Sequence, residues 1–333
     1  MSLIQSKKVT VLGCGAWALT IANSLAQNGH AVSLFAYKQA IVDEINTTHT
    51  REKLPGITLD TSIIATSSLE DAIKNSQAII VCMPSNYIKE TLALWKPYYN
   101  ESIPVLCLTK GIVSESELFL SNVFKEVLKN INFALLSGPN LALEIAQGKP
   151  AASVVATPNQ QTAVFFQSLL SNKNFRVYTS IDTIGVACGG ILKNIMAIAS
   201  GCIDALNFGL NTKSLLITRS LVEIIAFGKA VGAKQETFYG LSGLGDLIAT
   251  CNSPLSRNYQ FGYEIGKEET LSEIKKKVSY IAEGVFTTKC IHLFAQKNNI
   301  SMPITQTVYS VLYENKNIKE SIYELMTRQL KEE

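Results

Sequence analysis

The first half of the chain alternates short runs of β-branched residues with longer stretches whose apolar positions recur at helical spacing. This alternation is typical of a parallel sheet covered by helices, because each parallel strand needs a crossover connection to reach the next one. Six or seven strands are expected at residues 8–12, 31–37, 63–66, 78–82, 105–108, 133–136 and 152–156, with a further short strand at 176–178.

The pattern changes after Ser180, where long segments with apolar residues at helical spacing replace the β-branched runs. The first of these segments starts behind Asp182, a residue type that caps helix N-termini. The 333 residues exceed the roughly 250–300 at which a single hydrophobic core stops growing. We therefore predict an α/β protein of two domains. Residues 1–180 form a Rossmann-type, mostly parallel sheet with helices on both faces, and residues 181–333 form an all-α domain.

Composition narrows the class of protein. Hydrophobic residues make up 47% and charged residues 17%, which is typical of a globular chain. A net charge of +3 is too small for a protein that neutralises a nucleic-acid backbone. The seven cysteines are widely spaced without a C-x-x-C pair, which indicates reduced thiols in a cytoplasmic protein. The most apolar stretch, residues 184–203, contains Lys193 and Asn194, so no membrane span is expected.

The N-terminal strand runs into the sequence Gly-x-Gly-x-x-Ala. Gly13 permits a tight turn, Gly15 lets the backbone approach a pyrophosphate, and Ala18 lets the next helix pack on the strand. The helix N-terminus then holds the anion through its N–H groups and its dipole. Because a strand precedes this turn and a helix and second strand follow it, the segment predicts a dinucleotide site rather than a merely structural glycine turn.

The end of the second strand indicates which dinucleotide binds. NAD-preferring sites place a carboxylate there for the ribose hydroxyls, but this chain has Ala36, Tyr37 and Lys38. Tyr37 can lie against adenine, and Lys38 can pair with a 2′-phosphate. We expect NADP(H) to be accepted at least as well as NAD(H).

Lys193 is a single cation in an apolar helix of small residues. Gly189 and Gly190 lie one turn before it and Ala197 one turn after, which leaves space for a ring or a substrate. Partial burial favours the neutral amine, as suits a group that gives and takes protons. The alternative is a lysine that extends from a helix edge into water.

Asp246 is a single carboxylate in a second glycine-rich apolar stretch, with Thr250 one helical turn later. Lys193 is its expected partner, since a nearby carboxylate orients an ammonium. The alternative is an aspartate that caps a helix.

Three further segments carry candidate ligand contacts. Ser256, Arg257 and Asn258 follow a proline turn and can present a guanidinium to a phosphate, although a plain surface arginine fits as well. Lys110 follows the strand at 105–108, at the sheet edge where open α/β sheets bind ligands. The turn at 137–140 can supply N–H groups and a helix cap at the same edge, or be an ordinary strand-to-helix turn. The three histidines lack metal-ligand spacing, so no metal is expected.

In this order the motifs closely resemble the bacterial NAD(P)-dependent glycerol-3-phosphate dehydrogenase family. They are Gly-Cys-Gly-Ala-Trp at 13–17, Thr-Lys-Gly at 109–111, Ser-Gly-Pro-Asn-Leu-Ala-Leu-Glu at 137–144, Leu-Lys-Asn at 192–194, Gly-Leu-Gly-Asp-Leu-Ile-Ala-Thr-Cys at 243–251, Ser-Arg-Asn at 256–258 and Ala-Glu-Gly at 282–284. The resemblance implies hydride transfer between NAD(P)H and dihydroxyacetone phosphate, with a product that feeds phospholipid synthesis. It also implies that Lys193 gives and takes the proton. Two positions depart from the family: Ala18 replaces a frequent third glycine, and Asn140 replaces serine or threonine.

Residue patterns and resemblance together give the expected site. Catalysis is assigned to Lys193, Asp246 and Lys110. Cofactor binding is assigned to Gly13, Gly15, Ala16, Trp17, Tyr37, Lys38, Lys110, Ala142, Arg257, Ile281 and Glu283. For Trp17, Ala142, Arg257, Ile281 and Glu283 this role is implied by the resemblance alone. Substrate binding is assigned to Lys110, Gly138, Asn140, Lys193, Asn194, Asp246, Thr250, Ser256, Arg257 and Asn258.

The expected ligand is a small phosphorylated three-carbon substrate, and the expected assembly is a homodimer. Two alternatives stay open: a 3-hydroxyacid or 6-phosphogluconate type dehydrogenase of the same architecture, and a module that senses NADPH without turnover.

Overall fold

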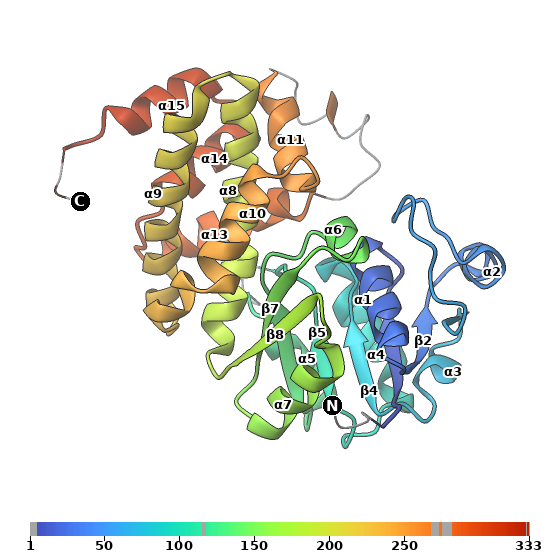
Figure 1. Ribbon diagram of the computed structural model, residues 1–333. Coiled ribbons are helices and arrows are strands. Elements are labelled where there is room, and N and C mark those ends of the chain that lie inside the picture. Colours follow the sequence, from blue (N-terminus) through green and yellow to red (C-terminus); the bar gives the residue numbers. More distant parts are fainter. Residues whose placement is uncertain (1–4, 115–117, 268–272, 275–281, 331, 333) are drawn as a thin grey trace. The chain divides into compact units, whose positions relative to one another are not determined.

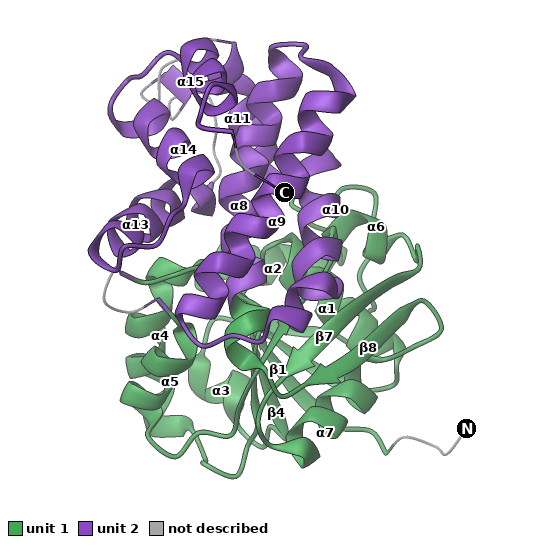
Figure 2. Cartoon of the chain, turned by 90° about the vertical axis from the view of Figure 1, so that its left-hand side faces the viewer, with its two compact units in different colours: residues 1–113, 119–187 green, residues 114–118, 188–333 purple. Residues whose placement is uncertain are grey.

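The computed structural model describes residues 5–114, 118–267, 273–274, 282–330 and 332 (Figure 1). The chain forms two compact units (Figure 2). The sheet unit comprises Met1–Val113 and Phe119–Ala187, and the helical unit comprises Ser114–Leu118 and Cys188–Glu333. The change falls inside one helix, α8 (Thr183–Ala205), and the domain limits expected near residue 180 stay a prediction.

The sheet has eight strands in the order β3-β2-β1-β4-β5-β6-β7-β8. Every neighbouring pair is parallel except β6 and β7, so the expected Rossmann-type, mostly parallel sheet is confirmed. The chain reverses direction along the sheet between β1 and β4, and ligands of such sheets bind at the carboxyl ends of strands at this point. The strands are β1 (Lys8–Leu12), β2 (Ala31–Phe35), β3 (Ile64–Thr66), β4 (Ala78–Val81), β5 (Val105–Cys107), β6 (Phe133–Ser137), β7 (Ala151–Ala156) and β8 (Phe175–Ser180).

Alternation along the central strands gives the sheet two apolar faces. In β1, Val9 and Val11 belong to one buried cluster and Leu12 to the other, since successive side chains of a strand point to opposite faces. One cluster contains Leu19 of α1, and the other contains Trp95 of α4. The helices of this unit are α1 (Ala16–Gln27), α2 (Gln39–Thr48), α3 (Leu69–Ile73), α4 (Ile88–Trp95), α5 (Leu120–Leu128), α6 (Ala142–Ala146) and α7 (Gln160–Leu170).

All regular elements described in the helical unit are helices, as its apolar periodicity predicts. They are the larger part of α8, then α9 (Gly209–Ala230), a 3₁₀ turn (Gln235–Tyr239), a π-helical turn η4 (Leu241–Gly245), α10 (Asp246–Asn252), α11 (Arg257–Gly266), α13 (Glu283–Lys297), α14 (Pro303–Tyr313) and α15 (Ile318–Met326).

Helix α8 is the central element of this part of the chain. Asp182 caps it, because its Oδ1 accepts from the Gly185 N–H at 2.9 Å. Among the described helices, only α8 is long and apolar enough to cross a membrane, but 89% of its most apolar window is buried inside the protein. Core helices of globular domains have the same composition.

Glycines bring α8 and α11 into backbone contact. A Cβ atom added at Gly201 would overlap the carbonyl oxygen of Tyr259, and one added at Gly262 would overlap that of Ile198. Glycine is therefore needed on both helices at this crossing, which fixes how closely α11 packs on α8.

Candidate active site

The glycine turn after β1 has the geometry of a dinucleotide turn. Gly13 has φ +129°, and an added Cβ would overlap the carbonyl oxygen of Cys82, which follows β4. Gly15 has an ordinary φ of −77°, precedes α1, and has no atom within 4 Å of where its Cβ would lie. No side chain caps the N-terminus of α1. Open space therefore lies beside the first turn of a helix, where N–H groups and the helix dipole favour a phosphate.

Several buried donors of the sheet unit have no hydrogen-bond partner among the described residues, and two of them belong to predicted site segments. These two are the indole Nε1 of Trp17 in α1 and the amide Nδ2 of Asn140 after β6. A buried donor left without an acceptor costs roughly 1–3 kcal/mol, so buried polar groups normally have a partner. A ligand that supplies acceptors fits this unit, and the residues present are compatible with a dinucleotide.

Basic residues that the sequence reasoning missed lie near the turn. Burial raises the pKa of the Cys14 thiol, and the positive charges of Arg51 and Lys53 oppose that rise. Arg51 forms an ion pair with Glu44, which holds the guanidinium in place. These charges come from the segment after α2, and no local pattern around residues 51 and 53 connects them with the turn.

Tyr37 and Lys38 follow β2 as expected. The Tyr37 side chain is 70% exposed, and the Lys38 ammonium lies 5.4 Å from the centre of its ring. The neighbouring Ala36 is buried, and none of the three residues that follow β2 carries a carboxylate. An exposed ring with a cation beside it is available to an adenine and a 2′-phosphate.

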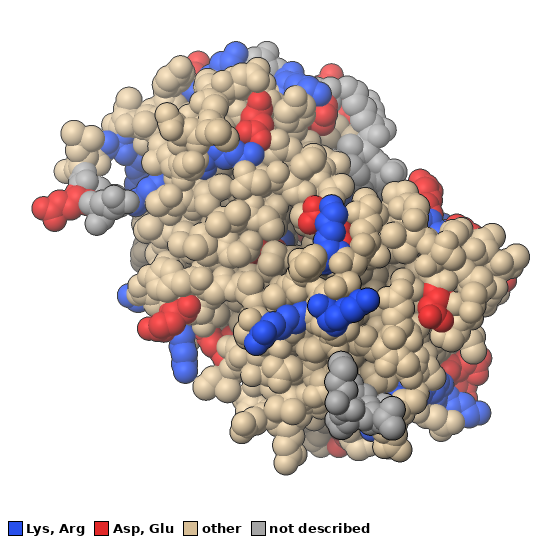
Figure 3. All heavy atoms as spheres, viewed as in Figure 1, with Lys and Arg blue, Asp and Glu red and all other residues tan. Residues whose placement is uncertain are grey.

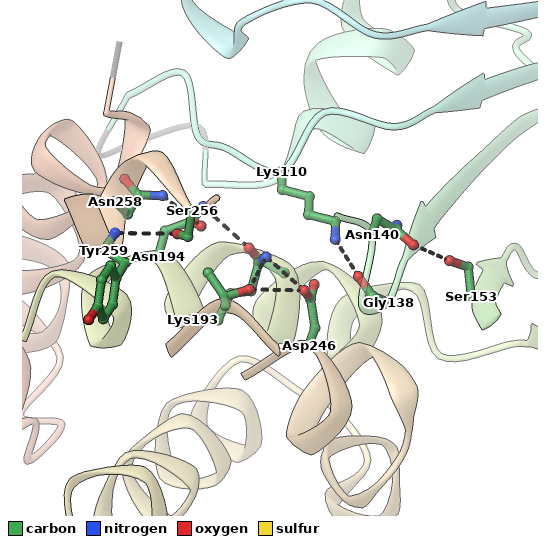
Figure 4. A network of polar contacts seen from close by, with 12 residues as sticks. Lys110, Gly138, Asn140, Ser153, Lys193, Asn194, Asp246, Ser256, Asn258 and Tyr259 are labelled. Atoms are coloured by element: carbon green, nitrogen blue, oxygen red, sulfur yellow. Dashed lines mark hydrogen bonds and ion pairs between the residues drawn. The ribbon is translucent and has the colours of Figure 1, made fainter. Parts of the chain in front are cut away.

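Lys110 lies beyond the end of β5 and reaches the loop after β6. Its Nζ donates to the carbonyl oxygen of Gly138 at 2.7 Å (Figure 4). Gly138 has φ +150° and lies against the backbone of Ser153, so glycine is required there. The two predicted residues Lys110 and Gly138 are thereby brought together.

The expectation that the turn at 137–140 caps a short helix is wrong. The N-cap residue of α6 is Leu141, and no side chain caps this helix. Asn140 Oδ1 instead accepts from the Ser153 hydroxyl of β7, which leaves the amide nitrogen described above. Ala142 starts α6, and its carbonyl accepts from Thr20 Oγ1 at 3.1 Å, which joins α6 to α1.

In the helical unit, Lys193 contacts both residues expected to lie beside it. Its Nζ donates to Asp246 Oδ1 at 2.7 Å and to Thr250 Oγ1 at 2.6 Å, and the Thr250 hydroxyl is 3.2 Å from Asp246 Oδ1 (Figure 4). The three residues are 8%, 1% and 4% exposed. A buried ammonium that keeps a carboxylate and a hydroxyl on one side is oriented for proton transfer.

The structure decides between the two interpretations of Asp246. Gly245 is the N-cap residue of α10, and Asp246 is the first residue of that helix with its carboxylate on Lys193. The helix-capping interpretation is therefore wrong.

The role expected for Gly189 is also wrong. An added Cβ at Gly189 would overlap the carbonyl oxygen of Ser242 in the π-helical turn, so this glycine leaves no space for a ligand. It lets α8 touch the turn that carries Asp246. The close contact brings the carboxylate within reach of Lys193.

The segment 256–258 forms the first turn of α11. Ser256 Oγ caps the helix by accepting from the Tyr259 N–H at 3.3 Å. Asn258 Nδ2 donates to Asn194 Oδ1 at 2.9 Å, and Asn258 Oδ1 accepts from the Gly284 N–H at 2.9 Å. Arg257 is exposed and has no hydrogen bond or ion pair among the described residues. A guanidinium at a helix N-terminus is suited to a phosphate.

Of the remaining predicted residues, the structure gives the positions of two in the fold. Ala16 starts α1, and Glu283 starts α13 next to the Gly284 that Asn258 binds. Ile281 lies outside the described residues. Within the described part of the chain, no three His, Cys, Asp or Glu side chains come together as metal ligands.

Comparisons with known proteins cover nearly the whole chain. The N-terminal model of NAD-dependent glycerol-3-phosphate dehydrogenases matches residues 8–163, and the C-terminal model matches residues 182–323. A curated relative from Carboxydothermus hydrogenoformans, named glycerol-3-phosphate dehydrogenase (NAD(P)+), is 42% identical over 331 residues and covers 98% of both chains. A relative of the same name from Fusobacterium nucleatum is 38% identical over 97% of this chain and 98% of its own.

Solved structures agree with the sequence relatives. The crystal structure of glycerol-3-phosphate dehydrogenase from Coxiella burnetii matches with a TM-score of 0.93 and 34% identity, over 97% of this chain and 99% of that one. The fold and both halves of the sequence thus agree, and the chain belongs to the family of NAD-dependent glycerol-3-phosphate dehydrogenases.

Proposed function

We propose that this protein catalyses reversible hydride transfer between NAD(P)H and dihydroxyacetone phosphate, with sn-glycerol 3-phosphate as the reduced product. The observation that carries the proposal is the buried contact of Lys193 with Asp246 and Thr250. Carbonyl reduction needs a positioned proton donor at the oxygen, and this amine is the group suited to it. Membership of the dehydrogenase family supports the same reaction.

The sheet unit binds the dinucleotide, which supplies the hydride when it is bound. The open face of Gly15 and the N-terminus of α1 receive the pyrophosphate, and the charges of Arg51 and Lys53 favour its binding. Ala16, Trp17, Ala142 and Glu283 are proposed to line the cofactor, as is Lys110, which also contacts the substrate.

The helical unit supplies the proton donor and the ligand of the substrate phosphate. Lys193 Nζ donates a proton as negative charge develops on the substrate oxygen, and in the reverse direction it accepts that proton. Asp246 and Thr250 hold the amine in one orientation. Arg257 binds the substrate phosphate, with Ser256, Asn258 and Asn194 as neighbouring hydrogen-bonding groups.

The test of the function is NADPH oxidation by the purified protein, followed by loss of nicotinamide absorbance. Dihydroxyacetone phosphate should give turnover, whereas 3-hydroxy acids and 6-phosphogluconate with NADP+ should not. Turnover with one of these acids alone would identify the rival dehydrogenase type, and NADPH binding without turnover of any of them would identify a sensing module.

Replacing Arg257 should weaken substrate binding rather than the chemical step. Loss of one charge-assisted hydrogen bond costs about 1.5–3 kcal/mol, so Arg257→Ala should raise KM for dihydroxyacetone phosphate roughly 10- to 150-fold with kcat little changed. Arg176→Ala, at an exposed arginine of β8, is the control and should behave as wild type. Equal KM values in the two variants would remove Arg257 from the phosphate site.

Lys38 should influence the choice between the two dinucleotides. Wild type should use NADPH at least as well as NADH, and Lys38→Ala should lower kcat/KM for NADPH roughly tenfold while leaving NADH unchanged, because only NADPH carries the 2′-phosphate. Initial rates with both cofactors measure this. A wild-type preference for NADH of about tenfold or more would contradict the role of Lys38 as the partner of the 2′-phosphate.

The cysteines and the surface charges support a cellular location and a class of ligand for this enzyme. None of the seven cysteines forms a disulfide, and five of them are buried, which supports a cytoplasmic protein. On the face shown in Figure 3, Lys and Arg occur singly or in small groups among uncharged residues, which supports a small-molecule substrate rather than a nucleic acid. Glycerol 3-phosphate would feed phospholipid synthesis, and the homodimer stays a prediction.

A further inference from the structure

A polar network lies behind the first turn of α11, one residue beyond the segment assigned to the substrate. The Tyr259 hydroxyl donates to Asp204 Oδ2 at 2.5 Å, and Lys213 Nζ donates to the same oxygen at 2.6 Å. The Lys213 ammonium also lies 5.3 Å from the centre of the Tyr259 ring and is 8% exposed. Three helices, α8, α9 and α11, each contribute one residue.

The position of Asp204 in α8 makes its negative charge unfavourable by itself. Asp204 lies in the last turn of α8, where the helix dipole disfavours a negative charge. Lys213 and Tyr259 compensate that charge. Burial, and then the hydrogen bond to Asp204, raise the pKa of Tyr259, so its hydroxyl stays protonated and keeps donating.

The network acts at the end of α11 where the backbone of this helix first meets α8. The carbonyl oxygen of Tyr259 already lies against Gly201 of α8, and Gly262 and Gly266 continue this close packing along α11. The side chains of the first turn add polar contacts to this packing: Asn258 to Asn194 and Gly284, and Tyr259 to Asp204. Arg257 lies directly between the Ser256 cap and these two anchored residues.

We propose that Tyr259, Asp204 and Lys213 form a positioning network that fixes the first turn of α11, so that Arg257 meets the substrate phosphate in one geometry. The inference rests on the proposed function, because it takes Arg257 as the phosphate ligand. Tyr259 is a positioning residue, since its own hydroxyl is occupied by Asp204 and it acts through the backbone of its neighbour.

The chain offers a matched control for the test. Tyr263 lies one turn later on α11 and stacks on Tyr259 with ring centres 6.4 Å apart. Its hydroxyl has no hydrogen bond among the described residues. Tyr259→Phe and Tyr263→Phe therefore remove the same group from the same helix, but only the first removes a tie to Asp204.

Both variants are assayed with dihydroxyacetone phosphate and NADPH, and inorganic phosphate is used as a competitive probe. Tyr259→Phe should raise KM for the substrate and the inhibition constant of phosphate about fivefold, with kcat unchanged, because only the guanidinium geometry is loosened. Tyr263→Phe should match wild type. Asp204→Asn, which keeps an acceptor but loses the charge, should give a smaller shift of the same sign.

The outcomes separate the two ideas. A wild-type protein that does not reduce dihydroxyacetone phosphate refutes the proposed function. A wild-type protein that does, together with Tyr259→Phe constants equal to those of Tyr263→Phe, refutes the positioning network. A purely structural role would lower the melting temperature of Tyr259→Phe and its active fraction without moving KM. If Tyr259→Phe does not fold, the Asp204→Asn comparison decides in the same way.

Discussion

Lys193→Ala is expected to lower the turnover number for dihydroxyacetone phosphate roughly 10²- to 10⁴-fold, the range that a positioned general acid contributes. The reason is local to the helical unit. The amine is 8% exposed, and the hydroxyl of Thr250 beside it is a far weaker acid that donates to Asp246 Oδ1 at 3.2 Å. Steady-state kinetics at saturating substrate and NADPH measure the loss. A variant with near-normal turnover would require a different proton donor.

The same substitution should also destabilise the protein, so the experiment must separate the loss of catalysis from the loss of stability. Without Lys193, the carboxylate of Asp246 is 1% exposed and loses its cation, which typically costs about 3–5 kcal/mol. Lys193→Met combined with Asp246→Asn removes both charges and should recover most of the thermal stability. Turnover should stay as low as in Lys193→Ala. Recovery of turnover together with stability would mean that Lys193 acts only in folding.

Local pattern was enough to predict the sheet and the pairing of Lys193. All eight expected strands are present, because buried parallel strands are runs of β-branched residues that differ clearly from the helical spacing around them. A single ammonium and a single carboxylate in apolar helices cannot both be buried at low cost unless they meet, so their contact followed from charge alone. Strand ends were less certain, and β2 ends at Phe35 rather than at residue 37.

Contacts between segments that are distant in the chain could not be predicted from the sequence. On α8 alone, Gly189 leaves a gap beside Lys193, but the π-helical turn packs against this glycine and fills the gap. Asparagine is a common helix cap, yet the side-chain oxygen of Asn140 accepts a hydrogen bond from Ser153 of β7 instead. Arg51 approaches Cys14 through a loop without regular structure. Tyr259 and Asp204 are 55 residues apart, and neither stands out in its own segment.

The glycines of the dinucleotide turn should separate folding from cofactor binding. Gly13→Ala combines a backbone at φ +129° with a Cβ that would overlap the carbonyl oxygen of Cys82, so both the turn and its packing on β4 must shift. We expect a loss of more than about 3 kcal/mol in the free energy of unfolding, or no folded protein. Gly15→Ala places a methyl group in open space at an ordinary φ of −77°. Its stability should change by less than about 1 kcal/mol.

Gly15→Ala should nevertheless lose affinity for the dinucleotide, because the new methyl group occupies the space through which a pyrophosphate approaches the N-terminus of α1. We expect Kd for NADPH to rise at least about tenfold, the effect of losing roughly 1.4 kcal/mol of phosphate contacts. Chemical denaturation without cofactor gives the stabilities, and fluorescence titration with NADPH gives the affinities. A Gly15→Ala protein that binds NADPH as wild type does would place the pyrophosphate elsewhere, and an intact Gly13→Ala protein would show that the backbone at this turn adapts to a side chain.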